Sequence, residues 1–216
     1  MTTANRARGW RLALAVALVG LLPGAARAGE RAFAIDPEAS SLEVSVFRAG
    51  LLSGLAHDHT IAAREISGRV VLDLARPAAG SVSLEAPARA LAVADANVSD
   101  DDRRSIEESM KGEVLEVEKF PTISFRSTGV EALEVAPGRL KVKVRGDLTL
   151  HGVTRAVEVP VDLLVEGTVL RAAGSVPLKQ TDHGIKPFQA ALGSITVKDE
   201  VKVSFRIIAK VEPAPR

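Results

Sequence analysis

The chain contains no cysteine and no tyrosine, and its single tryptophan is Trp10. The absence of cysteine excludes disulfide bonds, catalytic thiols and Cys-ligated zinc or iron–sulfur clusters. Lys and Arg together number 28 against 27 Asp and Glu, so there is no basic excess of the kind that indicates nucleic-acid binding. With 46% hydrophobic and 25% charged residues, the composition excludes a disordered chain and a multi-span membrane protein.

Common sequence patterns of enzyme active sites are also absent. The chain has no Gly-x-Ser-x-Gly, no His-Glu-x-x-His, no P-loop and no Gly-x-Gly-x-x-Gly segment. Neighbouring acids such as Glu107-Glu108 and Asp199-Glu200 are typical of solvated positions. The sequence therefore predicts a protein without catalytic activity and without a cofactor.

The N-terminal segment has the organisation of an export signal. Three arginines and no acid precede an apolar run from Leu12 to Leu22, which is too short for a permanent membrane anchor. Pro23 and Gly24 break the run, and Ala26-Arg27-Ala28 has the small-x-small form of a cleavage site. We expect residues 1–28 to be a secretory signal peptide cleaved after Ala28, and residues 29–216 to form one domain in the periplasm.

Alternation of apolar and polar residues dominates the remaining chain. In Ser41–Val46, for example, Leu42, Val44 and Val46 share one face, which is the pattern of a strand buried on one side. Gly, Pro, Asp or Asn bound these runs. The other alternating runs are 66–74, 81–86, 122–130, 140–150, 154–165, 169–176 and 201–209.

One segment is predicted to be helical, from about Asp100 to Lys111 and ending at or before Gly112. Ser99 is a suitable N-cap, and acids fill the first turn, where they favour the helix dipole. Ile106 and Met110 lie four residues apart on one face. Many strands with a single helix indicate an all-β barrel or sandwich. Between two alternating runs, His151-Gly152 predicts a tight hairpin turn.

Four segments in order resemble the YceI-like family of exported proteins. They are the entry segment Phe33–Ser40, the segments Leu115–Thr128 and Val144–Arg155, and Asp182–Ile185 with the closing strand Asp199–Ala209. The resemblance covers essentially the whole chain after residue 28. It implies an extended lipocalin-like fold, an eight-stranded antiparallel barrel with one main helix alongside. Such a barrel holds an isoprenoid, with or without a quinone head, or another long-chain lipid in its lumen.

The alternation agrees with that implication, because closing the strands turns one apolar face of each into the lumen. A dry lumen favours an alkyl or polyprenyl chain, at about 0.8 kcal/mol per buried CH₂. Transient contact with a membrane is compatible with such a role. The candidate lumen residues are Val44, Val46, Val70, Leu72, Leu84, Phe125, Val142, Val144, Val159, Val203 and Phe205.

Histidines at unusual positions depart from the family pattern. His57 and His59 would point to one side of a strand and could bind a metal with His183, Asp58 or Asp182 as third ligand. Alternatively His57 and His59 lie in a polar loop at the barrel rim. A third interpretation makes His57, His59, His183 and Lys186 the contacts of a lipid or quinone head group. A solid-core barrel that binds a protein partner is a further alternative.

Overall fold

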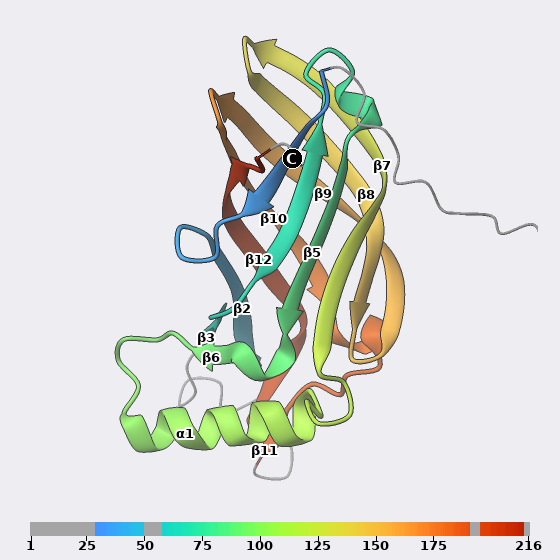
Figure 1. Cartoon of the computed structure of the whole chain (residues 1–216). Helices are drawn as coiled ribbons and strands as arrows, with labels where there is room; N and C mark the ends of the chain where they lie inside the picture. Colours follow the sequence, from blue (N-terminus) through green and yellow to red (C-terminus); the bar gives the residue numbers. More distant parts are fainter. Residues whose placement is uncertain (1–28, 50–57, 191–194, 214–216) are drawn as a thin grey trace, which may run out of the picture.

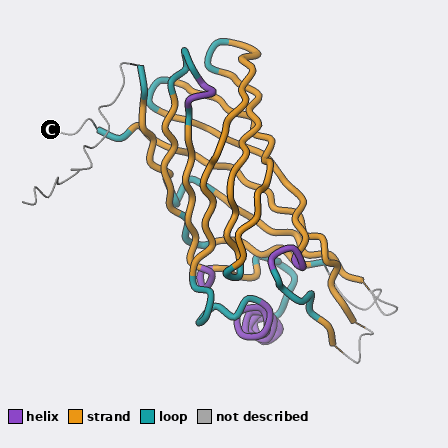
Figure 2. Tube along the Cα trace, turned by 90° about the vertical axis from the view of Figure 1, so that its right-hand side faces the viewer, coloured by secondary structure: helices purple, strands orange, loops and turns teal. Residues whose placement is uncertain are grey.

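The computed structural model describes residues 29–49, 58–190 and 195–213, so the predicted signal peptide and His57 lie outside the described residues. Most of the described chain is antiparallel sheet (Figures 1 and 2). The strands are β1 Arg31–Ile35, β2 Ser41–Ala49, β3 His59–Ala63, β4 Ser67–Leu72, β5 Ser81–Pro87, β6 Leu91–Val93, β7 Thr122–Ala136, β8 Arg139–Leu150, β9 Val153–Glu166, β10 Val169–Lys179, β11 Gln189–Ala190 and β12 Ile195–Val211. The helical elements are α1 Asp100–Ser109 and the short turns η2 Pro77–Ala79, η3 Ala88–Ala90, η4 Met110–Val114 and η5 Gln180–His183.

The sheet closes on itself as a barrel. Hydrogen-bonded neighbours follow the order β1-β4-β5-β7-β8-β9-β10-β12, and β12 pairs with β1 to complete eight strands. This confirms the predicted all-β, eight-stranded antiparallel barrel with one main helix. The alternation that predicted it recurs in β8, where buried and exposed residues alternate from Arg139 to Asp147.

Strand β12 pairs along one edge with two different strands. Its C-terminal residues pair with β1, and the residues before them pair with β2, which β3 and β6 extend. Between β1 and β2 the Ser40 hydroxyl forms the hydrogen bonds that a paired strand would give to β12. Its Oγ donates to the Ile208 carbonyl (3.2 Å) and accepts from the Ile208 N–H (3.0 Å). The β2-β3-β6 extension therefore lengthens the barrel wall at one end.

Helix α1 lies across that extended end, as Figures 1 and 2 show from two sides. The predicted cap is confirmed, since the Asp102 N–H donates to Ser99 Oγ (3.2 Å), and the first turn contains three aspartates. The α-helix ends at Ser109, before Gly112 as predicted, but the turn that follows it was not predicted. A π-helical turn continues to Val114, because the Leu115 N–H reaches the Met110 carbonyl (2.9 Å) and absorbs the glycine inside a wide turn.

The hairpin prediction is confirmed at Leu150–Val153. His151 and Gly152 have φ values of 52° and 71°, and two positive values are what a type I′ turn between strands requires. Three short strands, β3, β6 and β11, were not predicted. They contain five, three and two residues, so any alternation covers too few positions to stand out.

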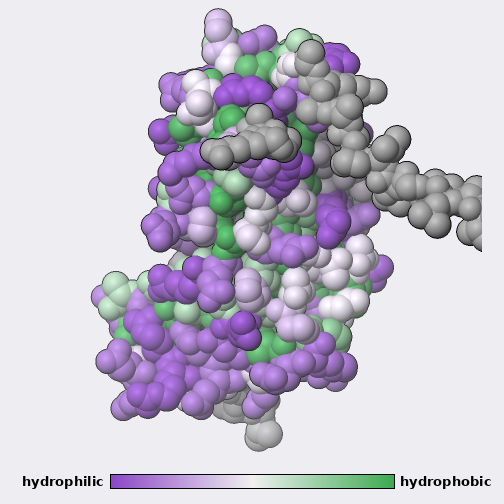
Figure 3. Space-filling view, viewed as in Figure 1, coloured by the Kyte–Doolittle hydropathy of each residue, from purple (hydrophilic) through white to green (hydrophobic). Residues whose placement is uncertain are grey.

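Two apolar clusters occupy the interior. The larger lies toward the end opposite α1 and includes Phe33, Leu140 and Leu170, which are 1%, 2% and 0% exposed. The smaller consists of Ile61, Leu91 and Val93, against which side chains of α1 and η4 pack. Hydrophilic residues cover most of the outer face in Figure 3. Among the described residues, none of the helices has the length and apolar character required to cross a membrane.

Candidate functional site: an apolar cavity inside the barrel

A cavity of about 590 Å³ occupies the barrel interior. Its wall draws on every strand of the closed barrel, on β1 through Ile35, and on the inner face of α1. The wall is overwhelmingly aliphatic. Arg48 and His59 are its only ionisable side chains within the described residues, and neither is acidic. Such a space can hold an apolar chain but offers few groups for polar recognition.

The structure places all eleven predicted lumen residues on this wall. One-residue bulges could have reversed the parity of any strand, and the ladder does shift between Ser127 and Gly129 and between Val197 and Val201. Both shifts lie away from the predicted residues of those strands. That these residues contact a ligand stays a prediction. The eleven are Val44, Val46, Val70, Leu72, Leu84, Phe125, Val142, Val144, Val159, Val203 and Phe205.

Two glycines keep the aromatic side chains of the wall out of the lumen. A Cβ added to Gly146 would lie 2.4 Å from Cζ of Phe125, and one added to Gly174 would lie 2.7 Å from Cζ of Phe205. Each ring therefore lies against the backbone of a neighbouring strand, where only glycine leaves room. The rings cover the glycines and stay close to the wall, which leaves the centre of the barrel unfilled.

Helix α1 closes the end of the cavity that the β2-β3-β6 extension surrounds. Ile106 and Met110, predicted to share one face, both line the cavity. The helix contains no fully buried residue, and polar side chains attach it to the edge strand β6. The Val93 N–H donates to Glu107 (2.9 Å), and Arg103 donates to the Val93 carbonyl (2.6 Å). In this way α1 supplies the hydrogen bonds that another strand would have given β6.

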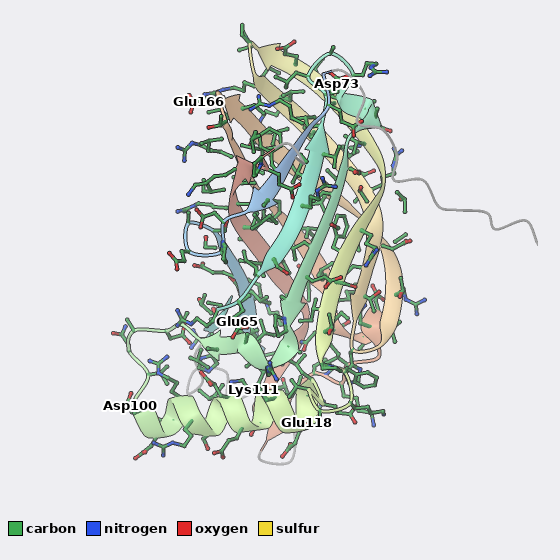
Figure 4. The ribbon with its side chains drawn as sticks, viewed as in Figure 1. Glu65, Asp73, Asp100, Lys111, Glu118 and Glu166 are labelled. Carbon is green, nitrogen blue, oxygen red and sulfur yellow. The ribbon has the colours of Figure 1, made fainter. Side chains whose placement is uncertain are left out.

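Glu107 also pairs with Lys111 (2.9 Å), as its i, i+4 spacing indicates. Burial disfavours the charged form of Glu107, but hydrogen bonds from Lys111 and from the Val93 N–H outweigh burial and hold the pKa of the carboxyl below its ordinary value. The attachment of the lid is therefore ionic and polar. Figure 4 shows Asp100 and Lys111 along this helix, at the opposite end of the molecule from Asp73 and Glu166.

His59 is the one predicted rim residue that lies on the cavity wall. Its Nδ1 is 2.8 Å from Oδ2 of Asp95, and Oδ1 of Asp95 accepts the Thr60 N–H (2.9 Å). The Asp95 carbonyl in turn accepts from Arg103 (2.8 Å), which joins this pair to the attachment of α1. The ring is thus fixed from β3, from the segment after β6 and from the helix.

Two other predicted rim residues, His183 and Lys186, lie away from the cavity wall. His183 is 2% exposed, does not line the cavity, and its Nδ1 is 3.1 Å from the Val153 carbonyl. Lys186 is exposed and also does not line the cavity. His57 lies outside the described residues. The described parts of the chain contain no group of three His, Asp or Glu side chains that could hold a metal ion.

The remaining histidine has a structural role. His151 Nε2 is 2.9 Å from Glu116 Oε2, and the imidazole lies against the Phe120 ring with centroids 4.2 Å apart. Glu116 and His151 both have positive φ, of 44° and 52°. The contact ties the chain that leaves the helix to the β8–β9 turn, as expected for a turn residue rather than a ligand.

Several wall residues were missed from the sequence. Arg48 continues the alternation of Val44 and Val46 and could have been found by extending that run two residues. Ile61 lies on the unpredicted strand β3. Phe188 follows Pro187 in an irregular segment and carries no periodic signal.

The comparisons agree with this architecture. The structure of BcnA from Burkholderia cenocepacia superposes with a TM-score of 0.64 at 20% identity, covering 82% of this chain and 99% of that one. A polyisoprenoid binding domain from Saccharophagus degradans, implicated in plant cell wall breakdown, gives a TM-score of 0.59 at 13% identity and covers 84% and 99%. The Campylobacter jejuni YceI protein gives 0.51 at 11% identity, covering 71% and 84%.

No curated protein matches the chain in sequence. The model of the YceI-like domain matches residues 33–209, which span most of the chain and contain the whole closed barrel apart from the ends of β1 and β12. The barrel, its single helix and this match lead to one conclusion: the chain belongs to the YceI-like domain family.

Proposed function

We propose that the protein is an exported, non-catalytic lipid-binding protein that holds one long isoprenoid or similar amphiphile in the barrel lumen. The observation that carries this proposal is the continuous apolar cavity of about 590 Å³. Its volume falls within the range of about 300–1,000 Å³ common for small-molecule sites. Membership of the YceI-like family and the likeness to a polyisoprenoid binding domain support the same ligand class.

Energetics favour a long chain over a compact ligand. Each methylene buried from water contributes about 0.8 kcal/mol, so ten of them contribute about 8 kcal/mol before the costs of binding. The wall offers almost no polar partner, so a ligand rich in polar groups would lose hydrogen bonds to water without replacing them. An isoprenoid with or without a quinone head meets both conditions.

The alternative of a solid-core barrel requires a filled interior, whereas this interior contains a cavity. The metal-binding alternative requires His57, which lies outside the described residues, and His59 already has Asp95 as its partner. The lipid-binding proposal is therefore the one that the apolar cavity supports.

The test is mass spectrometry of an organic extract from the purified native protein and two matched variants. Val144→Phe places a ring in the lumen, and Val135→Phe makes the same change at an exposed position of β7. We expect a long-chain amphiphile from the wild type and Val135→Phe, and its loss from a folded Val144→Phe. If the protein yields no lipid, or if folded Val144→Phe retains it unchanged, the lumen is not the binding site.

Export to the periplasm is part of the same proposal and rests on the sequence of residues 1–28. Cleavage after Ala28 would remove Trp10, and the chain has no tyrosine, so the mature protein should absorb almost no light near 280 nm. N-terminal sequencing of the envelope fraction should begin at Gly29. Recovery of Met1 there would contradict the cleavage.

A further inference from the structure

The ionisable side chains that line the cavity, Arg48 and His59 among the described residues, come from β2 and β3 at its α1 end. His59 is about four-fifths buried, with 22% of its side chain exposed, and Asp95 is 19% exposed. Both oxygens of the Asp95 carboxylate are occupied, Oδ2 by the ring and Oδ1 by the Thr60 N–H. In the described part of the chain, the second ring nitrogen of His59, Nε2, has no hydrogen-bond partner.

Asp95 fixes which ring nitrogen carries the proton. A carboxylate only accepts hydrogen bonds, so Nδ1 must carry the hydrogen that lies between them. In the neutral ring, Nε2 is then an acceptor that lines the cavity. Arg48 lies on the same face of β2 as Val46, whose register partner on β3 is His59, and a guanidinium only donates.

We infer that this end of the cavity is a head-group subsite in which His59, with its tautomer fixed by Asp95, selects a lipid whose head bears a hydroxyl. A hydroxyl can donate to Nε2 and so gives this acceptor a partner. An ether or a ketone has no hydrogen to donate and leaves the Nε2 acceptor without a partner. This inference rests on the proposed lipid-binding function and names the ligand class within it: a long-chain alcohol such as a prenol.

Selection should be marked, because sites built to hydrogen-bond a hydroxyl reject analogues that lack it. We expect about a tenfold preference for geranylgeraniol over its methyl ether, which has the same chain. Binding is measured by displacement of a neutral fluorescent naphthylamine at about pH 8.5, where imidazole side chains are neutral. Competition by free glycerol separates capture of the whole lipid from binding of a bare hydroxyl.

Asp95→Asn tests whether Asp95 controls the ligand preference, because a purely structural contact would not change that preference when it is replaced. Its amide oxygen can keep the Thr60 N–H while its NH₂ group faces Nδ1, which moves the ring hydrogen to Nε2. The preference for the alcohol should then fall to near one or reverse in favour of the ether. His59→Phe, which keeps a ring without nitrogen, should abolish the preference and leave affinity for the ether within about twofold.

The outcomes separate the two proposals. If wild type binds both probes equally, or if the alcohol preference survives both variants, the head-group inference is overturned while lipid binding stands. If neither probe binds to wild type, the lipid-binding proposal fails and the subsite fails with it. The inference would also be overturned if glycerol alone displaced the fluorescent probe at concentrations similar to those of geranylgeraniol, since the site would then bind a bare hydroxyl and not a lipid.

Discussion

The two ends of the barrel are built differently. At the end opposite α1, Phe33 and Leu140 fill the interior without lining the cavity, and Leu170 is fully buried beside them. At the α1 end, the cover is a helix with no buried residue, attached by Arg103 and Glu107 to one strand edge. The difference separates two tasks, because the packed end stabilises the fold and the polar attachment can open without unfolding the barrel.

The largest effect that tests this comparison is a cavity made at the packed end. Leu140→Ala should lower the free energy of unfolding by about 2–5 kcal/mol, since the packed side chains around Leu140 cannot fully fill the space left by the missing atoms. Met110→Ala, a matched truncation at the helix end, should cost about 1 kcal/mol or less. Chemical denaturation followed by far-UV circular dichroism measures both. Equal losses would show that the helix end also bears the stability of the fold.

The second-largest effect is expected from a substitution that fills the middle of the lumen. Gly146→Ala would force the Phe125 ring off the wall and into the cavity, lowering stability by about 1–3 kcal/mol and weakening binding of a long chain. Gly129→Ala is the control, because nothing lies within 4 Å of the added Cβ. Lipid retention and denaturation midpoints measure the two effects. Unchanged retention in Gly146→Ala would contradict the function assigned to the glycine.

Loosening the lid should change rates more than stability. Arg103→Ala removes hydrogen bonds to the carbonyls of Val93 and Asp95 and should cost about 1 kcal/mol of docking, or roughly fivefold faster ligand release. Arg104→Ala is the control, since Arg104 pairs only with exposed Asp101. Stopped-flow release of a fluorescent lipid measures the rates. Identical release from both variants would mean that α1 does not limit exit.

The smallest expected effect is that of acid on the same lid. Because the folded pKa of Glu107 is depressed below its ordinary 4.5, its contribution is complete above that value and is lost as the pH falls through the folded pKa. Release should therefore accelerate from about pH 4.5 downward. Glu107→Gln should show faster release at neutral pH and a smaller acid effect. A parallel acid response in both proteins would place the cause in other groups.

The sequence was sufficient for the barrel because alternation with period two extends over long strands such as β8. Where the period was carried by three or five residues, as in β6 and β3, local pattern was too weak and tertiary pairing determined the strand. The helix start was predictable from the Ser99 cap. The α-helix also ends before Gly112 as predicted, but the π turn after it was not predictable, because it depends on how Met110 and Leu115 pack against the barrel rather than on local propensity.

The candidate site divides in the same way. The aliphatic wall follows from alternation, so its eleven predicted residues could be named before the strands were placed. The partners of His59 could not, since Asp95 is 36 residues away and meets it only across the β3–β6 pair. The glycines that receive Phe125 and Phe205 are also cross-strand contacts and carry no signal along the chain.

The most direct test of the account uses the absence of cysteine in the chain. A single cysteine introduced as Met110→Cys at the helix end, or as Leu140→Cys at the packed end, is the only thiol that N-ethylmaleimide can label. We predict that Met110→Cys is labelled at least about tenfold faster, and that bound geranylgeraniol slows its labelling without changing that of Leu140→Cys, because Leu140 does not line the cavity. Equal labelling rates at the two ends, or no protection by the lipid, would contradict a lumen that is entered beneath α1.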